Sequence, residues 1–101
     1  MTGRQKLEAM EQRTRLINRA RGRCEVCGKI LVNPQVAHRV PQHKRYLRRY
    51  GKAVIHHPLN LKVVCSLRCN SAVLLDPATR PIETEELIQQ IKEDLRVAND
   101  N

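Results

Sequence analysis

The segment Cys65-Ser66-Leu67-Arg68-Cys69-Asn70 contains two cysteines in a C-x3-C arrangement. A second pair lies far upstream, in Cys24-Glu25-Val26-Cys27, and the two pairs hold every cysteine of the chain. Each close pair can direct two sulfurs at one ion from a tight turn or from the first turn of a helix, as tetrahedral zinc sites require. We therefore predict a structural Zn²⁺ bound by Cys24, Cys27, Cys65 and Cys69.

Two disulfides or four unliganded thiols are the alternative interpretation of these cysteines. The N-terminal Met-Thr-Gly-Arg-Gln-Lys is too polar for a signal peptide, and no run of about 18 apolar residues could cross a membrane. We therefore expect a cytoplasmic protein, in a reducing compartment where disulfides are rare. This expectation favours zinc.

The composition also favours a structural metal. The chain has 101 residues, which is enough for one compact domain, and it has no Phe, no Trp and only two Tyr. The large apolar side chains that usually stabilise a small core are therefore scarce. Metal binding would supply the missing stability, because binding energy contributes directly to folding in small metal-containing domains.

The net charge of +9 is unevenly distributed. Residues 1–23 carry seven Lys and Arg against two acidic residues, and residues 24–82 carry ten against two. Residues 83–101 reverse the balance, with two basic residues against six acidic ones. The basic part is suited to polyanionic phosphate, although a solvated basic surface without a partner would have the same composition.

Two predicted helices flank the cysteine-containing core. Apolar residues recur at three- and four-residue spacing over residues 4–21, so this segment is predicted as a helix that ends at Gly22. Residues 84–97 show the same pattern, with Thr84 as the expected N-cap. Residues 76–81 contain two prolines and are predicted as the linker before this last helix. We expect the last helix to pack on its own domain, so that the protein is a monomer; pairing with a second protomer is the alternative.

Two strands and two short helices are predicted between these flanking helices. The first strand covers residues 35–40, and the apolar runs 53–55 and 61–64 are expected to form the second. A basic helix is predicted over residues 42–51, closed by a glycine. Ser66 is the expected cap of a further helix that runs toward Asp76.

Four short motifs follow one another in a characteristic order. They are Cys24-Glu25-Val26-Cys27-Gly28, Val36-Ala37-His38-Arg39-Val40, His56-His57-Pro58-Leu59-Asn60 and Cys69-Asn70. Together they resemble the HNH endonuclease family, the ββα-metal nucleases, over roughly residues 20–76. In that family a histidine ends the first strand, an asparagine precedes the second strand, and a histidine or asparagine lies in the following helix. The matching residues are His38, Asn60 and Asn70.

This resemblance implies an α+β fold with a small zinc-stabilised ββα-metal core. The core would cover residues 24–76, preceded by a basic N-terminal helix in residues 1–23. A linker and an acidic amphipathic helix in residues 77–101 would follow, and the three parts would form one compact domain.

The resemblance also implies a role for each of the three matching residues. His38 would be the general base that deprotonates a water molecule. Asn60 would not touch the substrate; its side-chain amide would hold the loop backbone that orients the imidazole. Asn70 would offer its carbonyl oxygen to a catalytic Mg²⁺ or Mn²⁺ ion. Taken singly, each residue has a plainer interpretation: Asn60 and Asn70 as caps of secondary structure, and His38 as a hydrogen-bonded core histidine.

One position departs from the family pattern. Many HNH enzymes have an acidic residue or a second histidine directly before the general base, where it binds the catalytic metal, and this chain has Ala37 there. Alanine cannot bind a cation. Either the site has lost its catalytic metal, or Asn70 holds the ion with waters, phosphate and another histidine, with His57 expected first and His56 and His43 as the other candidates.

The function that the family resemblance implies is DNA phosphodiester hydrolysis in a bacterial or phage setting. The expected DNA-binding residues are basic side chains near the predicted first strand and in the basic helix that follows: Arg39, Lys44, Arg45, Arg48 and Arg49. The leading alternative is a zinc-stabilised DNA-binding or adaptor protein that keeps the scaffold without the chemistry. A zinc-bound protein-interaction module that uses the acidic C-terminal helix is a third possibility.

Overall fold

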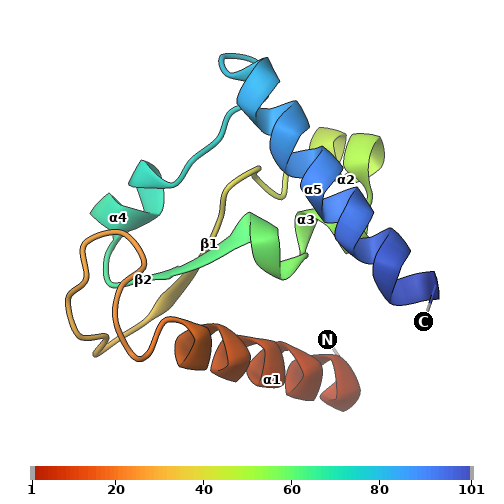
Figure 1. Cartoon of the computed structure of the whole chain (residues 1–101). Helices are drawn as coiled ribbons and strands as arrows, with labels where there is room; N and C mark the ends of the chain where they lie inside the picture. Colours follow the sequence, from red (N-terminus) through yellow and green to blue (C-terminus); the bar gives the residue numbers. More distant parts are fainter. Residues whose placement is uncertain (1, 101) are drawn as a thin grey trace. The chain divides into compact units, whose positions relative to one another are not determined.

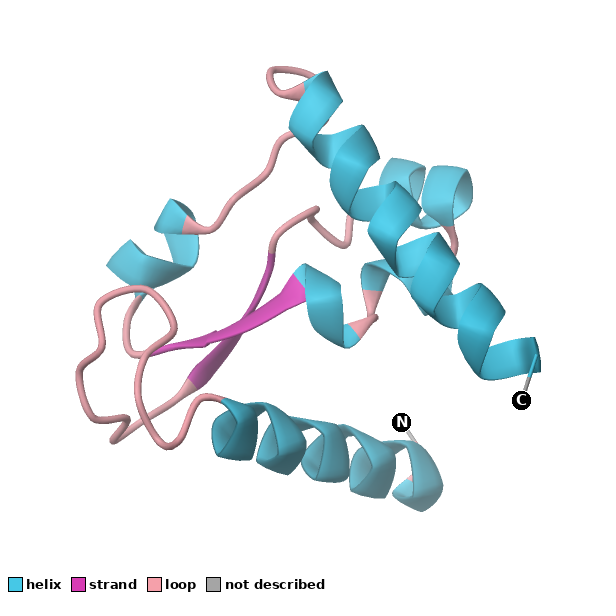
Figure 2. Ribbon diagram, in the orientation of Figure 1, coloured by secondary structure: helices cyan, strands magenta, loops and turns pink. Residues whose placement is uncertain are grey.

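The computed structural model describes residues 2–100, apart from the side chain of Asp100, and has an α+β fold (Figure 1). Figure 2 shows helices together with one two-stranded antiparallel sheet, as the sequence predicts at this level. Among the described residues, none of the helices combines the length and the apolar character that a membrane crossing requires. The elements, in chain order, are α1 (Gly3–Arg19), β1 (Gln35–His38), α2 (Lys44–Tyr50), α3 (Lys52–Ile55), the 3₁₀ helix η1 (Pro58–Asn60), β2 (Leu61–Val64), α4 (Leu67–Ala72) and α5 (Pro81–Asp100).

The chain divides into two compact units, each built from two separate segments. Unit 1 contains the chain up to Ala37 together with Lys62–Ala72, and unit 2 contains His38–Leu61 and the chain from Val73 onward. All four cysteines belong to unit 1, and all four histidines belong to unit 2. The two kinds of candidate site can therefore be described separately.

The first helix of unit 1, α1, confirms the helix predicted over residues 4–21. Thr2 caps it: its hydroxyl accepts a hydrogen bond from the Gln5 amide, and the Gln5 side chain accepts one from the Thr2 amide. The helix ends because Arg21 and Gly22 adopt left-handed backbone angles, with φ of 56° and 73°. Leu16 is the buried residue of this helix, so most of its surface is solvated.

The two strands are shorter than predicted. β1 ends at His38, two residues before the predicted end, and β2 contains only Leu61–Val64. The prediction that residues 53–55 belong to the second strand is wrong, because they form the helical turn α3. Val54 and Ile55 are both buried there, whereas a strand would point two consecutive residues to opposite faces. A helical turn lets both reach the same core.

Unit 2 is organised around one apolar cluster. α5 contributes Leu87, Ile88 and Ile91, which pack with the buried residues of the preceding segments: Val40, Tyr46, Val54, Ile55 and Leu75. α5 lies against α3 and η1. This face matches the apolar stripe that the sequence places on the C-terminal helix. Tyr46 is a buried member of the cluster, and Tyr50 packs at its edge.

The boundaries of the last two helices differ from the predictions. α4 ends at Ala72 and does not continue toward Asp76. α5 begins at Pro81, so the prediction of Thr84 as the N-cap is wrong. Proline suits the first turn, where its missing N–H costs nothing, and the Thr84 hydroxyl donates instead to the Arg80 carbonyl at 2.8 Å within the helix.

Candidate metal centre and histidine cluster

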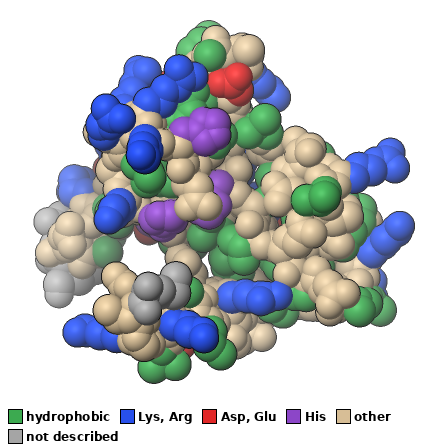
Figure 3. Space-filling view, turned by 180° about the vertical axis from the view of Figure 1, so that it is seen from behind, with side chains coloured by type: hydrophobic (Ala, Val, Ile, Leu, Met, Phe, Trp, Pro, Cys, Tyr) green, Lys and Arg blue, Asp and Glu red, His purple; other side chains and the backbone are tan. Residues whose placement is uncertain are grey.

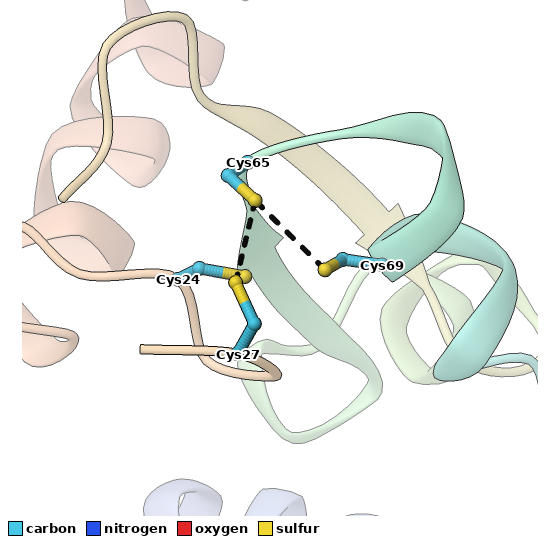
Figure 4. A group of neighbouring side chains, drawn as sticks. All are labelled: Cys24, Cys27, Cys65 and Cys69. Atoms are coloured by element: carbon cyan, nitrogen blue, oxygen red, sulfur yellow. Dashed lines mark hydrogen bonds between the residues drawn. The ribbon is translucent and has the colours of Figure 1, made fainter. Parts of the chain in front are cut away.

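The four cysteines of unit 1 lie together with their side chains pointing toward one another (Figure 4). All four sulfurs lie within 4.8 Å of one another, and all are free thiols. The Cys65 sulfur is 3.5 Å from that of Cys27 and 3.8 Å from that of Cys69. A tetrahedral zinc ion with Zn–S bonds of about 2.3 Å sets its sulfurs about 3.8 Å apart. The donor set and the spacing therefore fit a structural zinc ion.

Local sequence explains how each cysteine pair is oriented toward the centre of the cluster. In the first pair, the Gly28 amide donates to the Cys24 carbonyl at 3.0 Å, which closes a tight turn, and Gly28 has a φ of 80° that favours glycine. In the second pair, Ser66 begins α4: its hydroxyl accepts from the Cys69 amide at 3.3 Å. The predicted capping role of Ser66 is confirmed.

The pKa values of the Cys24 and Cys69 thiols are shifted in opposite directions. Burial of Cys24 opposes ionisation, but hydrogen bonds from the backbone amides of Cys27 and Val26 outweigh it and lower the pKa of the Cys24 thiol to about 6. At Cys69 a hydrogen bond with Ser66 favours the thiolate, yet burial and the neighbouring sulfurs raise the pKa to about 11. A divalent cation would resolve this conflict, because its charge stabilises several thiolates at once.

Glu25 is a supporting residue that the motif analysis missed. Its backbone amide donates to the Val63 carbonyl, and its carboxylate accepts from the Val63 amide, both at 2.9 Å. The same carboxylate accepts from Arg19 at 2.6 Å. Glu25 thus joins α1, the first cysteine pair and β2. A sequence signal was present, since Glu25 is the only acidic residue between positions 24 and 75.

In unit 2, two histidines face each other. The His38 Nε2 atom lies 3.2 Å from the His56 Nδ1 atom, and the rings meet edge to face. Burial lowers the pKa of His38 below its ordinary value, and the Coulombic effect of His56 lowers it further. The His38 imidazole is therefore held in its neutral form, which can accept a proton or bind a metal ion.

Asn60 ties together the backbone segments that carry these two histidines. Its side-chain oxygen accepts from the Val40 amide at 2.8 Å, and its side-chain nitrogen donates to the carbonyls of Val40 and Ile55 at 3.1 and 2.8 Å. Val40 is two residues beyond His38, and Ile55 directly precedes His56. The amide is fully buried and holds backbone, as expected for this asparagine; its contribution to catalysis stays a prediction.

Asn60→Ala should destabilise unit 2 strongly. The change leaves three backbone groups without their partner in a buried site, at a cost of about 1–3 kcal/mol each, against a total stability of about 5–15 kcal/mol. Urea unfolding followed by circular dichroism should show a clearly lower midpoint. Asn33→Ala, at an exposed position, is the matched control and should leave the midpoint unchanged. Equal midpoints for the two variants would contradict the structural role of Asn60.

His57 is not the histidine that faces His38. Its Nε2 lies 2.7 Å from an Asp94 carboxylate oxygen, and its Nδ1 accepts from the Leu59 amide at 3.1 Å. Both ring nitrogens are thus engaged in attaching η1 to α5. Among the three candidate histidines, His56 contacts His38 and His43 stacks on Tyr46, so these contacts favour His56 over His57, and the identity of the substitute metal ligand stays a prediction.

The remaining predicted residues lie in different places. Asn70 belongs to α4 in unit 1, where its side-chain nitrogen is 3.5 Å from the Gln35 side-chain oxygen. The side-chain carbonyl oxygen of Asn70 is the atom that would bind a hard cation. The structure thus brings His38 and Asn60 into one unit, and the grouping of Asn70 with them stays a prediction.

The expected DNA-binding residues all belong to unit 2. Arg39 follows β1, and the other four lie on α2: Lys44, Arg45, Arg48 and Arg49. Residues 38–61 contain six Lys and Arg and no acidic residue. Figure 3 shows histidine side chains gathered on one face of the molecule with lysine and arginine side chains beside them. A polyanion would be attracted to this segment.

Comparisons with protein-family models, with curated proteins and with solved structures find no match for this chain. Its function is therefore inferred from the arrangement of its own residues.

Proposed function

We propose that this chain is a metal-dependent endonuclease of the HNH type that hydrolyses DNA phosphodiester bonds. The observation that carries the proposal is the buried Asn60 amide, which fixes the backbone beside both His38 and His56. A plain core histidine needs no such support. Two facing imidazoles on a bound backbone are instead typical of a preorganised reaction centre.

His38 is the general base of this proposal. Hydrolysis needs a water molecule to lose its proton as it attacks phosphorus, and a neutral imidazole accepts that proton near neutral pH. The lowered pKa of His38 supports this role, because it keeps the ring unprotonated before the reaction. Asn60 acts through the backbone and is a positioning residue.

A hard divalent cation such as Mg²⁺ or Mn²⁺ completes the proposed centre. When bound, it would neutralise the scissile phosphate and the charge that develops on the leaving oxygen. In unit 2, His56 is the proposed protein ligand in place of Ala37, and the family resemblance implies the Asn70 carbonyl oxygen as a further ligand. The four-cysteine centre has a separate, structural task, since four thiolates leave zinc no open position for a phosphate.

The proposal is tested by nicking of supercoiled plasmid DNA. Purified protein should nick the plasmid only after Mg²⁺ or Mn²⁺ is added, and zinc alone should not support cleavage. Relaxed and linear forms separate from the supercoiled form on a gel and report the rate. A wild-type preparation that contains zinc, binds DNA and cuts nothing with any divalent ion would overturn the enzymatic proposal.

That negative result would support the second candidate, a non-catalytic zinc-stabilised DNA-binding or adaptor protein. The observation that favours this candidate is Ala37, which removes a metal ligand that many HNH enzymes have. The basic segment 38–61 would then serve for DNA binding alone. Cleavage, and not binding, separates the two candidates.

A further inference from the structure

The basic side chains of α2 fall into two pairs with different surroundings. Arg45 and Arg49 are four residues apart and therefore lie on the same side of the helix, and Lys44 and Arg48 form a second pair at the same spacing. The Arg45 guanidinium lies over the Tyr46 ring at 4.9 Å from its centroid. Arg49 lies over the Tyr50 ring at 5.2 Å. Only the first pair has an aromatic support among the contacts of the described residues.

These stacked arginines are fixed more firmly than ordinary surface arginines. The Tyr46 and Tyr50 rings are stacked, with their centroids 6.3 Å apart, and Tyr46 is buried in the apolar cluster of unit 2. Arg45 also donates to the Tyr46 hydroxyl at 3.0 Å. A guanidinium that lies over a ring is partly ordered before binding, so it loses less entropy when its remaining N–H groups bind a phosphate.

A pocket with both polar and apolar walls lies beside the arginine pair. It has a volume of about 340 Å³ and is lined by Arg45, Tyr46, Arg49, Pro77 and Ala78. Neither Lys44 nor Arg48 lines it. A phosphate with part of its sugar is smaller than this volume, so a segment of nucleic-acid backbone can enter.

The nearby acidic residue does not cancel the positive charge. The Asp76 carboxylate accepts from the Ala78 amide at 2.9 Å and lies 3.5 Å from the Tyr46 hydroxyl. It therefore anchors the turn and the tyrosine that form the pocket wall. Two arginines against one engaged carboxylate leave the pocket cationic.

We propose that the pocket formed by Arg45, Arg49 and the 76–78 turn binds one backbone phosphate of the DNA through both guanidinium groups. Planar, forked donors match the oxygens of a phosphate in a way that lysine does not. The inference rests on the proposed function, in which DNA is the substrate, and adds the site where one phosphate of its backbone binds. None of the residues that line the pocket belongs to the His38–His56 pair. The phosphate held here is accordingly not the one that is cut.

The test compares two double variants of the full chain that lose the same charge from the same helix. Binding of a fluorescent duplex is measured over a range of salt concentrations, without added Mg²⁺ so that no strand is cut. Arg45→Gln/Arg49→Gln should bind about 100-fold more weakly, at about tenfold for each lost charged contact, and its salt slope should fall by about one, since one phosphate contact is lost. Lys44→Gln/Arg48→Gln, which removes two of the other expected DNA-binding side chains, should weaken binding by a smaller factor of less than about tenfold, because these side chains neither line the pocket nor lie over a tyrosine ring.

A charge-preserving variant separates geometry from charge. Arg45→Lys/Arg49→Lys should keep most of the salt slope and still bind about tenfold more weakly, since lysine has no planar fork. Equal losses in the two glutamine variants, or wild-type affinity in the lysine variant, would overturn the inference while leaving the proposed function intact. Failure of the wild type to bind duplex DNA at low salt would overturn both. Thermal melting of each variant confirms that unit 2 remains folded.

Discussion

Replacing His38 with alanine is expected to reduce plasmid cleavage by about 10²- to 10⁴-fold, the usual contribution of a general base. The reason is that no other group in the proposed mechanism accepts the proton of the attacking water. Zinc content and DNA affinity should be unchanged, because His38 is neither a ligand of the cysteine centre nor a member of the arginine pocket. The rate of supercoiled plasmid loss, measured at saturating Mg²⁺, gives the result directly.

His43→Ala is the matched control for this variant. His43 belongs to the same unit and stacks on Tyr46, away from the His38–His56 contact, so its removal should leave cleavage close to wild type.

Asn70→Ala and His56→Ala should both raise the Mg²⁺ concentration needed for cleavage. His57→Ala should instead lower the thermal stability of unit 2, because it loses the Asp94 contact. Equal cleavage by wild type and His38→Ala would point to a contaminating nuclease or another base.

Cys65→Ser is expected to unfold unit 1. Apart from two cysteines, the buried apolar residues of this unit are few and small to medium in size: Leu16, Ala37, Val63 and Val64. A structural zinc site contributes about 10–16 kcal/mol in small metal-binding peptides, which equals or exceeds the whole stability of a typical domain, about 5–15 kcal/mol. Loss of one of four ligands removes a large part of that contribution.

The loss of zinc and of folded structure in Cys65→Ser can be measured as metal content and as helical circular dichroism of the same preparation. Wild type should hold one zinc ion per chain and unfold in strong chelator. Ser71→Ala, an exposed change in α4, is the matched control and should keep both the zinc and the spectrum. Wild-type protein that contains no zinc and stays folded in chelator would rule out the proposed structural role of the metal.

Features that depend on short sequence spacing could be predicted best. Two cysteine pairs define a donor set because each pair forms a local turn, and the structure brings all four sulfurs together. The Asn60 contacts with backbone were also expected from the family resemblance. The helix of residues 3–19 followed from its apolar periodicity and its glycine stop.

Features that depend on tertiary partners could not be predicted from local patterns. Residues 53–55 have strand-forming side chains, but the unit 2 core takes both Val54 and Ile55 from one side. His56 and His57 are adjacent and chemically identical in the sequence, and only their partners distinguish them: His38 for the first and Asp94 for the second. Glu25 was missed because its partner, Val63, is 38 residues away.

Each unit is built from two separated segments, so the order in which the segments leave the ribosome determines when each unit can fold. Cys24 and Cys27 emerge long before Cys65 and Cys69, so the four-cysteine centre cannot close until Cys69 has been synthesised. The apolar cluster of unit 2 forms later still, because it includes Ile88 and Ile91 of α5. Unit 2 therefore cannot complete its fold as a nascent chain that ends before α5, whereas unit 1 needs no residue beyond Ala72. The residues of α5 must be synthesised before the histidine pair gains its supporting core.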